Sequence, residues 1–108
     1  MARTKIPERI KHVVNDYVHT LKKERLPIEH VFLFGSYAKG TEHRWSDVDI
    51  CVVSSKFRDP TDAIQYLLSK RTINLRYPIE PIGMSPADFA EDTTLTREIK
   101  RRGIEIMA

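Results

Sequence analysis

A short apolar segment that ends at a glycine-serine pair, with two aspartates ten residues later, constrains this chain more than any other feature. Residues 31–34 predict a buried strand, and Gly35 with Ser36 predicts a tight turn at its end. The run Ser46-Asp47-Val48-Asp49-Ile50 predicts a second strand. Because successive side chains of a strand point to opposite faces, the two aspartates lie on one face and the two aliphatic residues on the other.

Two carboxylates on one face of a strand repel each other, and in a partly dry site one takes up a proton unless a cation lies between them. Oxygen ligands of this kind suit Mg²⁺ or Mn²⁺. Gly35 lets the backbone turn sharply and lets a ligand approach it closely, and Ser36 begins a segment whose amides can face an anion. Phosphate is the natural occupant of such a place. The segment therefore predicts a nucleotide held through its phosphates beside magnesium.

The pattern over residues 34–50 resembles the signature of the DNA polymerase beta-type nucleotidyltransferase superfamily. In that signature a hydrophobic residue precedes Gly-Ser, and alternating aspartates and hydrophobic residues follow. The short chain is similar to the minimal members of the superfamily, the MNT proteins, which are often paired with HEPN toxins. The resemblance implies an α/β fold in which a small mixed sheet has helices packed on one face.

The resemblance also implies the residues of an active site. It asks for a third carboxylate on a later strand, for which Glu80 is the candidate. The catalytic residues and the ligands of two Mg²⁺ ions, or of Mn²⁺, are then Asp47, Asp49 and Glu80. The phosphates of ATP are held by Gly35, Ser36 and Lys39. A solvent-exposed glutamate at the edge of the sheet is the other interpretation of Glu80.

Composition indicates a folded domain, because 41% of the 108 residues are hydrophobic and 31% are charged. We expect residues 1–108 to form a single domain. The net charge of +3 is compatible with a nucleotide or RNA partner, but nucleic acid is not favoured because no aromatic residues interleave with the basic cluster at residues 22–25. The single cysteine, Cys51, lies in an apolar strand and predicts a buried thiol. No apolar run is long enough for a membrane span, so the cytoplasm is the expected location.

Local patterns predict the order of the elements. Helices are expected over residues 7–25, from Asp59, from Ser85 and from about Thr94, with a helical turn over residues 36–39. Strands are expected over residues 28–34 and 48–54, within residues 74–83 and over residues 104–106. Prolines in the third of these strands indicate an edge position or the end of a strand. The helix that follows Asp59 is expected to bury Ala63, Ile64, Leu67 and Leu68.

Several residues near the motif allow two interpretations. Lys39 and Arg44 can each reach a phosphate or remain exposed loop charges, and the exposed interpretation is favoured for Arg44. Trp45 can stack on a base, although an aromatic residue beside a strand more often packs against the core. His12 and His19 lie on one side of the first helix, where exposed polar histidines are expected rather than a zinc site.

The predicted reaction transfers a nucleoside monophosphate, AMP from ATP, to an acceptor hydroxyl. The resemblance suggests that the acceptor belongs to a partner toxin and that this chain is the antitoxin. A non-catalytic antitoxin that neutralises its partner by complex formation is the alternative from another class, and a nucleotide and metal sensor is a third. The sequence does not predict the oligomeric state.

Overall fold

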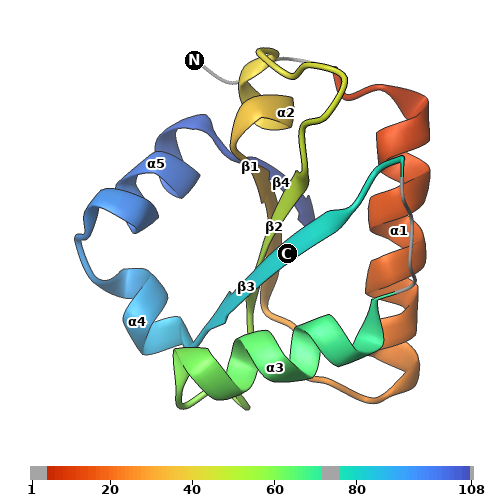
Figure 1. The fold of residues 1–108 in the computed structure, drawn as a ribbon. Coiled ribbons are helices and arrows are strands. Elements are labelled where there is room, and N and C mark those ends of the chain that lie inside the picture. The colour runs from red at the N-terminus through yellow and green to blue at the C-terminus, as the bar shows by residue number, and fades with distance from the viewer. Residues whose placement is uncertain (1–4, 72–75, 108) are drawn as a thin grey trace.

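The computed structural model describes residues 5–71 and 76–107 and contains a four-stranded sheet with helices on both sides (Figure 1). The helices are α1 (Glu8–Lys23), α2 (Ser36–Lys39), α3 (Pro60–Lys70), α4 (Pro86–Ala90) and α5 (Thr94–Arg102). The strands are β1 (His30–Phe34), β2 (Val48–Val53), β3 (Ile79–Met84) and β4 (Ile104–Met107). These elements confirm the predicted order. Residues 74 and 75 of the predicted segment 74–83 lie outside the described residues.

The sheet is mixed, with the strand order β3-β2-β1-β4. Strand β1 pairs antiparallel with β2 and with β4, whereas β2 and β3 run parallel. Parallel neighbours need a long crossover, and α3 provides it. Strand β3 lies at the edge, as its prolines predict. Part of that edge is covered because the Arg71 Nη1 atom donates a hydrogen bond to the Ile79 carbonyl oxygen over 2.8 Å.

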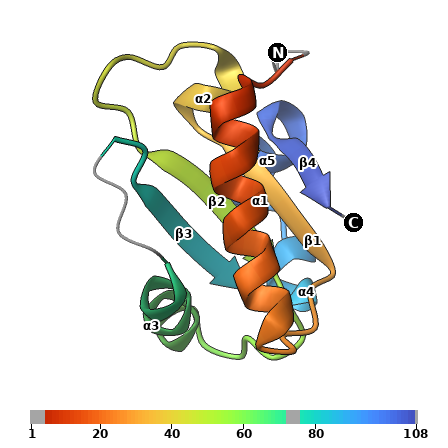
Figure 2. The same cartoon turned by 90° about the vertical axis from the view of Figure 1, so that its right-hand side faces the viewer.

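Helices cover both faces of the sheet, so the expectation of helices on one face is wrong, although the mixed α/β class is confirmed. Helix α1 crosses one face, as Figure 2 shows, and α3 joins it in the main core. On the opposite face, Ile99 of α5 and Phe89 of α4 pack against side chains of β1 and β2. Residues 50–53 are all buried because β2 is covered on both sides. Such a continuous apolar run is typical of a strand with two covered faces.

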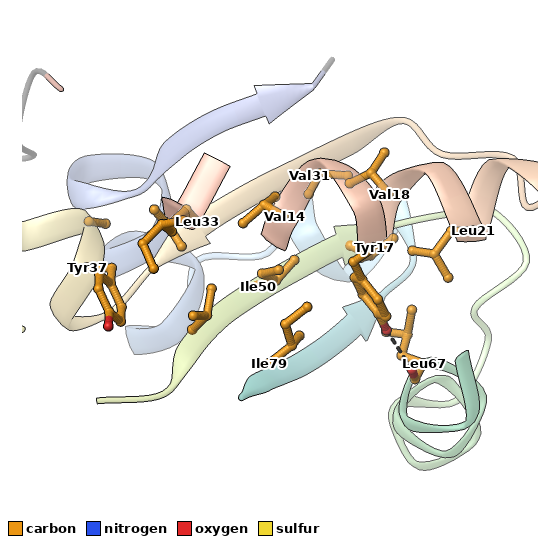
Figure 3. Packing of buried hydrophobic residues seen from close by; sticks show 14 of the residues in the cluster. Val14, Tyr17, Val18, Leu21, Val31, Leu33, Tyr37, Ile50, Leu67 and Ile79 are labelled. Carbon is orange, nitrogen blue, oxygen red and sulfur yellow. Dashed lines mark hydrogen bonds between the residues drawn. The ribbon is translucent and has the colours of Figure 1, made fainter. Parts of the chain in front are cut away.

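The main core joins α1 to β1, β2 and α3 through aliphatic side chains (Figure 3). Tyr17 lies among them, and its hydroxyl donates a hydrogen bond to the carbonyl oxygen of Leu67 over 2.6 Å. Burial of this kind requires a partner for the phenol, and the helix backbone supplies it. Cys51 is buried as predicted, and burial raises the pKa of its thiol to about 12.

The ends of the later helices are stabilised by the predicted capping residues. Asp59 accepts a hydrogen bond from the Thr61 amide over 2.8 Å, and Ser85 accepts one from the Asp88 amide over 3.0 Å. Pro60 and Pro86 occupy first-turn positions. Asp59 therefore has a structural role at a helix terminus. None of the helices within the described part of the chain is long and apolar enough to cross a membrane.

Only half of the predicted buried side of α3 is buried. Ala63 and Leu67 are buried, whereas Ile64 and Leu68 are 36% and 38% exposed. Residues four apart share one face of a helix, and each residue of the second pair lies about 100° around the axis from its neighbour in the first. The first pair reaches the sheet, and the second pair lies at the border with solvent.

We expect Leu67→Ala to lower the free energy of unfolding by about 2–5 kcal/mol, because it leaves a cavity in the core. Leu68→Ala is the matched control and should change it by less than about 1 kcal/mol, since that side chain is already partly in water. Urea denaturation followed by circular dichroism measures both. Equal losses would contradict the observed orientation of α3.

Candidate active site

The strand register brings the predicted carboxylates to one end of the sheet. Asp49 is paired with Phe34 on one side and with Glu80 on the other. Gly35 directly follows Phe34, and Asp47 directly precedes β2. Neighbouring residues in register extend their side chains to the same face of a sheet. The glycine of the turn and all three carboxylates therefore gather at the start of β2.

Gly35 is required by both its backbone conformation and its neighbour. Its φ of 71° and ψ of −151° lie in a region that is essentially restricted to glycine. A Cβ atom at this position would overlap the Asp49 Oδ2 atom and would lie 3.0 Å from its Cγ atom. The Asp49 carboxylate thus lies directly against the backbone where α2 begins.

The carboxyl groups of Glu80 and Asp47 lie beside each other and interact. A side-chain hydrogen bond to Asp47 is the largest cause that raises the pKa of Glu80, followed by burial and by the negative charge of Asp47. The Arg71 charge lowers this pKa in part. Glu80 is solvent-exposed and also lies beside Asp47, so it combines features of both sequence interpretations.

The pKa of the Asp49 carboxyl group is raised well above its ordinary value. Burial is the largest cause that raises its pKa, which reaches about 6. Further negative charges that raise it are those of Glu80, Asp47 and Glu98. The positive charge of Lys39 acts in the opposite direction. Carboxylates held close together in a partly dry site repel each other until a cation or a proton neutralises part of their charge.

Two charged residues near the carboxylates were not predicted from the sequence. Glu98 of α5 acts on Asp49 and lies 3.9 Å from the Lys39 Nζ atom. Arg71, just after α3, acts on Glu80 and lines the same hollow as Asp47. Neither residue belongs to a motif, because each reaches the site through the packing of its helix. Their spacing in the sequence contains no signal for this role.

Other candidates lie apart from the carboxylates. Trp45 is 76% exposed, so the expectation that it packs is wrong. The Arg44 guanidinium stacks over its ring, 5.1 Å from the centroid, and both residues line a separate hollow. His12 and His19 are exposed, as expected.

The donor atoms of the site suit a cation shared with a ligand. Within residues 5–71 and 76–107, no group of three or more His, Cys, Asp or Glu side chains converges closely enough to hold a metal ion. Mg²⁺ usually takes one or two protein carboxylates and completes its shell with phosphates and water. Asp47 and Asp49 fit that partial role, with Glu80 beside them.

A hollow of about 430 Å³ adjoins the carboxylates. Its polar lining includes Asp47, Glu80 and Arg71, and its apolar lining includes the exposed Ile64 and Leu68 of α3. An apolar surface next to charged groups allows a ligand to be positioned by contact and oriented by a few polar atoms. The hollow therefore gives a second molecule access to the carboxylates from the β3 edge.

The sequence matches the nucleotidyltransferase domain family over residues 15–106. This chain belongs to the nucleotidyltransferase domain family. The resemblance inferred from residues 34–50 is thereby confirmed. Over 40 residues the chain is 42% identical to the protein adenylyltransferase MntA of Shewanella oneidensis. That match covers 36% of this chain and 29% of the relative.

Solved structures of toxin-antitoxin complexes share the fold of this nucleotidyltransferase domain. A variant of the MntA-HpeT toxin-antitoxin pair, with two aspartates changed to glutamate, superposes with a TM-score of 0.61 at 23% identity. The match covers 87% of this chain and 72% of that chain. A toxin-antitoxin structure with AMP-PNP gives a TM-score of 0.59 at 25% identity, over 87% of this chain and 72% of the other.

We expect Gly35→Ala to destabilise the domain by about 3 kcal/mol or more, because it combines backbone strain with overlap of the Asp49 carboxylate. Gly40→Ala is the matched control, since Gly40 has a left-handed φ of 76° and is exposed, and it should cost about 1–2 kcal/mol. Chemical denaturation measures both changes.

The overlap is tested separately by adding Asp49→Ala to Gly35→Ala, which removes the atoms in conflict. Partial recovery of stability in the double variant is the expected result. If the losses in the free energy of unfolding of the two single variants simply add in the double variant, backbone strain alone explains the effect of Gly35→Ala.

Proposed function

We propose that this domain transfers AMP from ATP to a hydroxyl group of a partner protein. The observation that carries the proposal is the close approach of the Asp49 carboxylate to Gly35, with Glu80 in register beside it. This arrangement places carboxylates that repel one another at the turn where α2 begins. In a nucleotidyltransferase domain, it is the natural position for a nucleotide whose phosphates share cations with the protein.

In the proposed site, Asp47 and Asp49 would hold two Mg²⁺ or Mn²⁺ ions. When bound, these ions neutralise phosphate charge and stabilise the attacking and leaving oxygens of the displacement. Glu80 either completes the metal site or accepts the proton of the acceptor hydroxyl. The same location beside Asp47 supports both roles.

The phosphates of ATP are proposed to lie against Gly35, Ser36 and Lys39. The absence of a side chain on Gly35 lets an anion approach the backbone, and the first amides of a helix have no acceptor within it. The charge of Lys39 acts on Asp49, which supports its proximity to the reacting phosphates.

The transfer forms one bond and breaks another. The acceptor oxygen bonds to the α-phosphorus of ATP, while the bond from that phosphorus to the oxygen bridging to the β-phosphate breaks. Pyrophosphate leaves with the bridging oxygen, and the hydroxyl proton passes to a carboxylate or to water. Positioning and charge neutralisation carry most of the rate enhancement in such reactions.

A protein acceptor, a toxin neutralised by this chain as its antitoxin, is supported by the hollow and by the relatives. Ile64 and Leu68 offer an apolar surface next to Asp47 and Glu80. The similar MntA protein is a protein adenylyltransferase, and the similar solved structures are toxin-antitoxin complexes. We extend this proposal to a HEPN-type toxin, a cytoplasmic location and a single domain over residues 1–108.

We expect Asp49→Asn to reduce AMP transfer by at least about 100-fold, because it removes a charge that acts on the nucleotide. The variant should remain folded, since the amide relieves repulsion from neighbouring carboxylates. The assay uses α-labelled ATP, Mg²⁺ and the protein encoded beside this chain. Asp59→Asn is the matched control and should keep full activity, because asparagine also caps a helix.

Turnover of Asp49→Asn within a few-fold of the wild type would contradict the proposed chemistry. Complex formation without label from any of the four ribonucleotides would instead identify a non-catalytic antitoxin. That outcome is the alternative in which the same surface neutralises the partner by binding alone.

We expect Glu80→Gln to lower transfer at least tenfold at saturating Mg²⁺ if Glu80 accepts the proton, because the amide cannot take it up. If Glu80 is a metal ligand, the variant instead needs more Mg²⁺ for half-maximal rate. Titration of Mg²⁺ separates the two results. Glu91→Gln, at an exposed position, is the control. A wild-type Mg²⁺ profile for Glu80→Gln would show that Glu80 is an exposed edge residue without a catalytic role.

A further inference from the structure

A second hollow lies on the α1 side of the sheet, between the start of α1, helix α2 and the segments that precede β2 and β3. Its volume is about 810 Å³. It is lined by Arg9, Tyr37, Glu42, His43, Arg44, Trp45, Arg76 and Tyr77. Tyr37 belongs to the core beneath α1, whereas Asp49 projects to the face covered by α5. The two sites therefore lie on opposite faces of the sheet.

Trp45 is displayed to solvent by a structured turn. The His43 amide donates a hydrogen bond to the Ser46 hydroxyl over 2.9 Å, and the Ser46 amide donates one to the His43 carbonyl over 3.0 Å. Trp45 itself donates its amide proton to the His43 Nδ1 atom over 3.2 Å. It is the most exposed of the large hydrophobic side chains in the described part of the chain. This turn holds the indole ring in water, where the face of a ligand can stack on it.

Guanidinium groups accompany both outer aromatic rings of the hollow. The Arg44 Cζ atom lies 5.1 Å from the Trp45 ring centroid. The Arg9 and Arg76 Cζ atoms lie 5.8 Å and 5.6 Å from the Tyr77 ring centroid. Three guanidinium groups and the Glu42 carboxylate thus contribute to the lining of the hollow. Arginine forms planar, forked contacts with phosphate, and stacking on a ring reduces the freedom that binding would remove.

We propose that this hollow binds single-stranded nucleic acid, with a base stacked on Trp45 and phosphates near Arg9, Arg44 and Arg76. Aromatic faces combined with cations are the common means of binding single strands. An acidic peptide would use the cations, but it does not supply a planar base for each charge that could stack on the indole. In a duplex, the faces of the bases are already stacked on each other.

The donor nucleotide of the transfer reaction accounts less well for the hollow. Its phosphates are proposed to lie beside Gly35 and Asp49, so its base would not need three arginines here. A single strand carries a phosphate for every base and uses both kinds of group. This proposal rests on the hollow alone and does not depend on the transfer reaction.

The intrinsic fluorescence of Trp45 tests the proposal directly, because the chain contains one tryptophan. The probes are twelve-nucleotide oligo(A) and oligo(U), an RNA duplex of equal length, and ATP with Mg²⁺. We expect the single strands to quench Trp45 and to bind at least tenfold more tightly than the duplex. Equal binding of the duplex would overturn the proposal. Competition by ATP at the affinity of its own reaction would also overturn it and would assign the hollow to the donor base.

Variants separate stacking from charge, measured by the fluorescence anisotropy of a labelled oligonucleotide. Trp45→Ala should weaken binding about tenfold or more, and Trp45→Phe should restore part of it. Arg44→Ala should reduce the slope of log affinity against log salt by about 0.7, the value for one phosphate contact in a single strand.

Arg58→Ala is the matched control, because Arg58 is exposed and lies outside this hollow. It should leave both the affinity and the salt slope near the wild-type values. Trp45 and Arg44 are themselves exposed, so their variants should fold normally, which circular dichroism verifies. Wild-type affinity in Trp45→Ala, or equal effects of Arg44→Ala and Arg58→Ala, would overturn the proposal.

Discussion

The contact between the Asp49 carboxylate and the Gly35 backbone determines the arrangement of the candidate active site. It exists only because Gly35 has no side chain and adopts a positive φ, which allows β1 to turn sharply into α2. The antiparallel pairing of β1 with β2 brings the two residues together. Backbone and carboxylate then occupy the same small region, where an anion and its cations can both be held.

Electrostatic repulsion is the second constraint on the site. Asp49 is half-buried, and its pKa of about 6 reflects first the burial of its carboxylate and then repulsion from the neighbouring carboxylates. Lys39 and Arg71 offset only part of this repulsion. A fold selected for stability alone has no need for such a group of charges. The most direct physical explanation is a ligand that brings positive charge, as the proposed nucleotide and its cations would.

The two faces of the sheet are covered differently, so the larger core and the carboxylates lie on opposite faces. The α1 face carries the large aliphatic core, which includes the Tyr17 hydrogen bond to α3. The α5 face carries a smaller apolar cluster and leaves room at one end for the carboxylates. The end of the sheet therefore presents two different surfaces, one acidic and one formed by aromatic and basic side chains.

The sequence by itself determined the features that depend on local geometry. Alternation places Asp47 and Asp49 on one face, Gly35 permits the turn, Asp59 and Ser85 cap helices, and prolines mark β3 as an edge strand. These follow from side-chain periodicity and backbone sterics, which neighbouring residues control. The tertiary structure alone decided the position of Glu80 beside Asp47, the approach of Glu98 and the covering of both faces of the sheet. Each of these depends on strand register or helix packing between residues far apart in the chain, and no local pattern specifies such long-range contacts.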